Sequence, residues 1–131
     1  FAISDDLLSS NVYVKTQIQP ITDEAGLSKG KAIFIKNCLA CHGANAEGLI
    51  GPNMTDKYWI HGGSLEDIIH IINVGVITKG MIPWKSLLTK EEIYQVSSYI
   101  LNLQGSNPKN AKAPEGELVK PIEEVKTKIE E

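Results

Sequence analysis

Arginine is absent from the 131 residues of this chain. Because the guanidinium group is the usual bidentate donor to phosphate, its absence argues against phosphate recognition and against binding to nucleic acid. The chain also has no run of the roughly 18 uninterrupted apolar residues that a membrane-spanning helix requires. The net charge is −3. The acidic excess lies in residues 115–131, which indicates a solvated end of the chain rather than a charged binding surface.

Cysteine is scarce as well, and the 2 cysteines of the chain lie together in the run Cys38-Leu-Ala-Cys41-His42. Cys-x-x-Cys-His is the pattern of c-type haem attachment, in which two thiols bind one haem and the histidine lies under the iron. Three other uses of the cysteines stay open: a zinc site, a redox-active thiol pair and a structural disulfide. Each fits less well. His61 and His70 are too far apart in sequence for the usual zinc spacing, no strand precedes the motif, and a disulfide leaves the histidine unexplained.

The chain divides into three parts by pattern. Residues 1–26 are predicted to be an extended N-terminal leader, residues 27–105 a small domain, and residues 106–131 a polar C-terminal tail that either wraps the domain or is loose. A core of this size is marginal, so a buried haem is expected to supply much of the apolar centre. The first residue is Phe1 rather than methionine, which fits a removed export signal or membrane anchor. With covalent haem, this predicts a periplasmic protein.

Helices account for the whole predicted domain, and no strand pattern is present. The first helix is predicted to begin with Ser28 as its N-cap and to deliver the haem motif at its end. Capping boxes at Ser64 and Thr89 open two further helices, which are expected to end near Val74 and Gly105. Glycine-rich loops join them. The predicted fold is therefore all-α, with three to five helices around one covalently bound haem.

An iron that only transfers electrons needs a second axial ligand opposite His42, and the chain has 2 methionines to offer. Met81 follows a helix that can carry the chain to the other face of the ring. In its loop, Gly80 is expected to permit close backbone approach and Pro83 to stiffen the chain. Met54 follows the haem motif on the histidine side and is expected to fill the core. We predict that Met81 is the ligand. The alternative is an open site, which suits gas binding or peroxidase chemistry.

Four further residues are predicted to border the haem. The backbone carbonyl of Pro52 is the candidate acceptor for the second ring N–H of His42, a bond that would orient the imidazole. Tyr58, Trp59 and Trp84 can each donate a hydrogen bond to a haem propionate while burying the ring. For each of these aromatic residues, plain core packing is the alternative.

With these residues in place, the chain resembles the class I cytochromes c over about residues 27–105. The match rests on Gly30 and Phe34 ahead of the haem motif and on Val96 and Tyr99 in the last helix. Gly-Pro after the motif and Gly-Met-x-Pro-Trp before the last helix also match. The resemblance implies the class I cytochrome c fold, with His42 and Met81 as iron ligands.

A closer likeness is to the haem c subunit III, of CcoP/FixP type and monohaem form, of cbb3-type cytochrome oxidases. It is carried by residues 51–63, 79–84 and 104–111. This resemblance implies an electron carrier rather than an enzyme, passing electrons to a terminal oxidase. The implied partners are that oxidase, a quinol-oxidising complex or another cytochrome. In the family the domain hangs from a membrane anchor, so the resemblance also implies tethering through an anchor removed from this chain.

Overall fold

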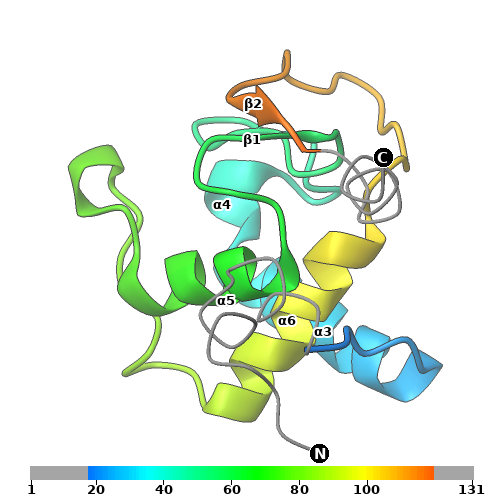
Figure 1. Cartoon of the computed structure of the whole chain (residues 1–131), viewed down its shortest axis with the longest axis vertical. Helices are drawn as coiled ribbons and strands as arrows, with labels where there is room; N and C mark the ends of the chain where they lie inside the picture. The colour runs from blue at the N-terminus through cyan, green and yellow to red at the C-terminus, as the bar shows by residue number, and fades with distance from the viewer. Residues whose placement is uncertain (1–17, 120–131) are drawn as a thin grey trace, which may run out of the picture.

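The computed structural model describes residues 18–119, which fold into a small helical domain with one pair of very short strands (Figure 1). The helices are α3 (Glu24–Asn37), α4 (Leu39–His42), α5 (Leu65–Val74) and α6 (Lys90–Asn102), with a 3₁₀ turn, η1, at Ile77–Lys79. The all-α prediction is confirmed for this part of the chain. The leader before residue 18 and the tail beyond residue 119 lie outside the described residues. No helix within residues 18–119 is long and apolar enough to cross a membrane.

Helix α3 begins at Glu24, so the prediction that Ser28 caps the first helix is wrong. The N-cap is Asp23, whose carboxylate accepts a hydrogen bond of 2.9 Å from the backbone N–H of Gly26. Aspartate and serine are both good N-cap residues. A start at Asp23 rather than at Ser28 adds a turn of helix and places Glu24 at the positive end of the helix dipole. Residues 24–26, predicted to be leader, therefore belong to the first helix.

The starts of the other two long helices are confirmed. Both capping boxes are present in full: Ser64 with Asp67 opens α5, and Thr89 with Glu92 opens α6. In each box the side chain of the N-cap residue accepts a hydrogen bond from the backbone N–H three residues later, and the side chain of that later residue accepts one from the backbone N–H of the N-cap. These two bonds fix the helix start. The end of α6 differs slightly from the prediction, because the helix stops at Asn102 and Gly105 follows with a φ of 83°.

The core forms where α3 crosses α6 and α5 packs on them. A Cβ atom on Gly30 would lie 2.2 Å from the carbonyl oxygen of Gln95 and 2.8 Å from Cβ of Tyr99, so the two helices touch at this glycine. One turn later the rings of Phe34 and Tyr99 meet, with centroids 5.7 Å apart and planes inclined by 55°. The buried apolar cluster around them consists of Phe34, Ala46, Ile68, Ile72, Ile93, Val96 and Ile100.

The described part of the C-terminal tail lies against the domain rather than away from it. Strand β2 (Glu117–Leu118) pairs antiparallel with β1 (Tyr58–Trp59), with Tyr58 opposite Leu118 and Trp59 opposite Glu117 (Figure 1). This pair corrects the expectation that no strand is present. Two-residue strands are too short to show an alternating pattern, so the sequence gives no signal for them. The boundaries of the domain at residues 27 and 105 stay predictions.

The crossing of α3 and α6 generates the first testable prediction. Gly30→Ala is expected to lower the free energy of unfolding by about 1–3 kcal/mol, because the added methyl group pushes against the α6 backbone. Denaturant unfolding followed by circular dichroism measures the change. Lys31→Ala, at the exposed neighbouring position of α3, is the matched control and should stay within about 0.5 kcal/mol. Equal stabilities of the two variants would contradict the close contact.

Candidate haem site

The Cys-x-x-Cys-His motif forms a separate turn of helix directly after α3. Cys38 ends α3 and begins α4, and its carbonyl oxygen accepts the backbone N–H of His42 at 3.0 Å. Both thiols are free, with Cys38 partly buried and Cys41 exposed. Burial, together with the neighbouring Cys41, raises the pKa of the Cys38 thiol to about 11. The folded chain therefore holds this thiol protonated at neutral pH.

The imidazole of His42 is held on two sides by the loop that follows α4. Its Nδ1 lies 3.0 Å from the carbonyl oxygen of Pro52 and donates a hydrogen bond to it, which confirms the predicted contact. A Cβ atom on Gly51 would lie only 2.6 to 2.9 Å from three atoms of the ring, so the backbone there rests against the imidazole face. With the proton on Nδ1, the other nitrogen, Nε2, is the one suited to bind a metal.

The charge state of His42 favours the same role. Burial lowers the pKa of this imidazole, and the positive charge of Lys112 lowers it further, while the hydrogen bond to Pro52 acts in the opposite direction. The net shift is downward from the usual value of 6.5. His42 is therefore neutral at neutral pH, which is the form that binds a metal.

Met81 lies in a loop that projects from the end of α5 (Figure 1) and is closed on itself. Val76 and Met81 exchange two backbone hydrogen bonds, of 2.9 and 3.1 Å, across η1. Gly80 has a φ of 87°, and apart from its two chain neighbours no described residue has an atom within 4 Å of the place a Cβ would take. Gly80 serves the left-handed turn of this loop, and the expectation that it permits close backbone approach at the haem stays a prediction.

A close backbone approach within this loop occurs at Gly75, the residue that follows the last residue of α5 and caps the helix. A Cβ there would lie 2.6 Å from the carbonyl oxygen of Met81 and 2.7 Å from the nitrogen of Pro83. The loop is tied back to α5 by a hydrogen bond of 2.9 Å from the N–H of Trp84 to the carbonyl of Ile72. The sequence alone does not distinguish a glycine that only ends a helix from a glycine against which a later part of the chain also packs.

Several predicted site residues lie, partly buried, at the boundary of the buried cluster. Partly buried side chains packed against the buried cluster include Cys38, Met54, Trp59, Met81 and Trp84. Met54 and Met81 both lie at this boundary, so packing alone does not choose between them. Tyr58 is more exposed than these residues, at 38%.

The indole of Trp59 supplies a test of whether the boundary fits a haem. Its Nε1 is buried and donates no hydrogen bond within the described part of the chain, and a Cβ on Gly63 would lie 2.7 Å from it. A buried donor without an acceptor costs about 1–3 kcal/mol. A propionate carboxylate is an acceptor suited to this N–H, so the residues present fit haem.

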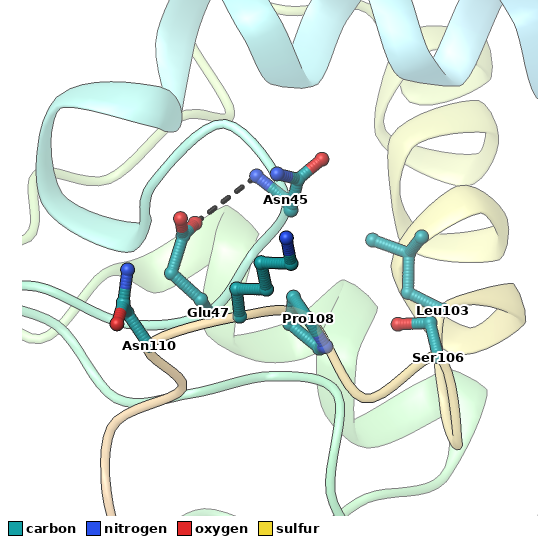
Figure 2. A pocket seen from close by; sticks show the side chains of 7 residues that line it. Asn45, Glu47, Leu103, Ser106, Pro108 and Asn110 are labelled. Atoms are coloured by element: carbon teal, nitrogen blue, oxygen red, sulfur yellow. Dashed lines mark hydrogen bonds between the residues drawn. The ribbon is translucent and has the colours of Figure 1, made fainter.

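A pocket of about 430 Å³ lies elsewhere, between the loop after α4 and the segment after α6 (Figure 2). The carboxylate of Glu47 turns toward Asn45 there and accepts the backbone N–H of Asn45 at 3.0 Å (Figure 2). None of the predicted haem residues lines this pocket, which is formed by Asn45, Glu47, Leu103, Ser106, Pro108, Lys109 and Asn110. Within residues 18–119, no three His, Cys, Asp or Glu side chains are grouped so that they could hold a metal ion.

Comparison with known proteins identifies the family. The profile of the family described as cytochrome c oxidase, cbb3-type, subunit III matches residues 25–100. The chain belongs to this family. Among its curated relatives is the cbb3-type cytochrome c oxidase subunit CcoP of Rubrivivax gelatinosus, 36% identical over 72% of this chain and 33% of that protein. The CcoP subunit of Rhodobacter capsulatus is 35% identical over 70% of this chain and 34% of its own length. The chain thus spans about a third of the length of these relatives.

Solved structures agree on the fold. Cytochrome cL of Methylophaga aminisulfidivorans is 26% identical, with a TM-score of 0.61 over 72% of this chain and 73% of that one. Cytochrome cL of Hyphomicrobium denitrificans is 24% identical, with a TM-score of 0.61 over 77% and 63%. The fold is that of a class I cytochrome c, as predicted. The family is one of electron-transferring cytochromes, and membership in it implies haem c as the cofactor.

The contact between Gly51 and the imidazole generates the second prediction. Gly51→Ala is expected to displace the His42 ring and to lower the free energy of unfolding by about 1–3 kcal/mol. Nitrogen-15 NMR of the ring would show the loss of the Nδ1–H bond, and denaturant unfolding would give the stability. Ile50→Ala is the control, because that neighbouring side chain is 80% exposed. An unchanged His42 signal in Gly51→Ala would count against the close packing.

Proposed function

We propose that this chain is a monohaem electron carrier whose haem is bound through thioether bonds to Cys38 and Cys41. The iron would be held by His42 on one side and by Met81 on the other. The observation that carries the proposal is the fixed imidazole at the end of the Cys-x-x-Cys-His turn, with its Nδ1 bonded to Pro52. When bound, the haem supplies a one-electron couple between Fe(III) and Fe(II).

The residues of the chain divide the remaining work. Pro52 and Gly51 hold the imidazole in the orientation that engages Nδ1 and leaves Nε2 as the nitrogen to bind iron. A thioether from Met81 opposite it would favour the ferrous state and raise the potential. Trp59 would give its buried N–H to a propionate, with Tyr58 and Trp84 as further donors at the border. We keep Met54 as a packing residue at the same boundary.

The partners follow from the relatives, which are subunits of cbb3-type oxidases. We propose that the chain receives electrons from a quinol-oxidising complex or another cytochrome and passes them to such an oxidase, without itself catalysing a reaction. A periplasmic location, with tethering through a membrane anchor, fits this role. The alternative of a ligand-binding or peroxidase-like domain with an open iron site is not favoured, because these relatives are named as oxidase subunits.

Covalent attachment is the first part of the proposal to test. The mass of the intact protein, matured in a host that attaches haem c, should exceed that of the polypeptide by one haem. The haem should stay with the polypeptide under denaturing conditions and be lost from it in the Cys38→Ala/Cys41→Ala double variant. Lys36→Ala, at an exposed position just before the motif, is the control and should keep the haem. A colourless wild-type protein, or one with the bare polypeptide mass, would end the proposal.

The sixth ligand is tested separately. Met81→Ala should lower the midpoint potential by on the order of 100 mV, within the roughly 0.8 V over which axial ligands tune haem. It should also let carbon monoxide bind the reduced protein at neutral pH. Spectroelectrochemical titration and the visible spectrum measure both effects. Met54→Ala is the matched control, since that methionine packs against the same cluster. If Met54→Ala shows these changes and Met81→Ala does not, the ligand assignment is reversed.

A further inference from the structure

The segment from Gly105 to Val119, called here the C-terminal strap, runs along the loop that carries Pro52 (Figure 1). Its β2 strand pairs with β1, and Gly116, at a φ of 92°, lies so close that a Cβ would be 2.3 Å from the carbonyl of Trp59. Three backbone N–H groups of the strap donate to loop carbonyls: Gly105 to Thr55 (2.8 Å), Lys112 to Glu47 (2.8 Å) and Val119 to Lys57 (2.9 Å).

Lys112 is the residue of the strap that is fixed most completely. Its carbonyl accepts a hydrogen bond of 3.2 Å from the side-chain amide of Asn53, which is buried. Its Cβ lies 2.8 Å from the place that a Cβ on Gly48 would occupy. Its Nζ lies 3.4 Å from the carbonyl oxygen of Ile50, to which it donates. Backbone, stem and ammonium group are thus all held on the loop that contacts His42.

This placement brings one positive charge to the His42 side of the site. Ile50, which binds the ammonium, is followed in the chain by Gly51, whose backbone rests on the imidazole. The only acidic partner recorded for Lys112 within residues 18–119 is Glu115, with Nζ and Oε2 3.3 Å apart. Both side chains of the pair are partly exposed, at 35% and 40%. Solvent therefore weakens the attraction between them, and Glu115 does not fully neutralise the positive charge of Lys112.

We propose that Lys112 is a tuning residue that raises the reduction potential of an iron bound by His42. Reduction from Fe(III) to Fe(II) adds one electron and removes one positive charge from the iron site. A fixed cation nearby therefore favours the reduced state. The inference rests on the proposed function, because it needs a haem iron on His42. It gives the strap a role in setting the reduction potential, in addition to covering the Pro52 loop.

The test uses the matured haem protein and spectroelectrochemical titration at low ionic strength. Lys112→Met keeps most of the stem and removes the charge. It should change the Fe(III)/Fe(II) ratio at a given applied potential two- to fivefold toward Fe(III), which is about 18 to 41 mV at 59 mV per tenfold. Lys112→Arg keeps the charge and should restore most of the shift. Because the ammonium is partly exposed, the shift should shrink in 1 M salt.

Two further variants separate charge from structure. Glu115→Gln removes the counter-charge and should move the potential in the opposite direction to Lys112→Met. Lys109→Met, at an exposed position of the same strap, is the control and should leave the potential unchanged. A wild-type potential in Lys112→Met with a normal haem spectrum would overturn the inference and leave the proposed function intact. A fall in potential for both Lys112→Met and Glu115→Gln would assign the effect to strap geometry and overturn it equally. Failure of every variant and of the wild type to bind haem would overturn the proposed function itself.

Discussion

The hydrogen bond from Nδ1 of His42 to the carbonyl oxygen of Pro52 is the constraint on which the arrangement of the site depends. It decides which ring nitrogen carries the proton, and so which one can bind a metal. The donor sits on α4, which is a single helical turn, and the acceptor sits in a loop. The bond persists because neighbouring residues hold the loop, chiefly the buried Asn53, whose side chain accepts from the N–H and hydroxyl of Thr55 at 2.8 and 2.7 Å.

The two loops of the site are stabilised in different ways. The Met81 loop is closed locally, by its bridge to Val76 and by the close approach of its backbone to Gly75. The loop carrying Pro52 is held by long-range bonds to the strap, among them the bond from Asn53 to the carbonyl of Lys112. A local closure depends on a few neighbouring residues, whereas a long-range one depends on a segment that comes much later in the chain. The Pro52 loop is therefore coupled to the C-terminal strap, and the Met81 loop is coupled to α5.

The sequence predicted features that depend on residue type at short range. The capping boxes of α5 and α6 have specific side chains at fixed spacing, and Pro52 follows the haem motif closely. It missed features that depend on long-range backbone contacts, because every residue but proline has the same N–H and carbonyl to offer. The β1–β2 pair and the bonds of Lys112 belong to this class. The start of α3 failed for another reason: Asp23 and Ser28 are both acceptable caps, and local preference alone does not rank them.

Stability and chemistry come from different parts of this small domain. The buried cluster is supplied almost entirely by α3, α5 and α6, whereas Met54 and Met81 reach its boundary from loops and Trp59 reaches it from the short strand β1. Loops carry function well only when something fixes them. Here the contacts that fix the Pro52 loop come from the strap, which lies beyond the boundary predicted at residue 105. Across the boundary predicted at residue 27, the N–H of Ile21 donates to Ser98 Oγ of α6 at 3.0 Å. A domain cut at residues 27 and 105 would lose the first turn of α3 with its Asp23 cap, and it would also lose the bonds from the strap that hold the Pro52 loop in place.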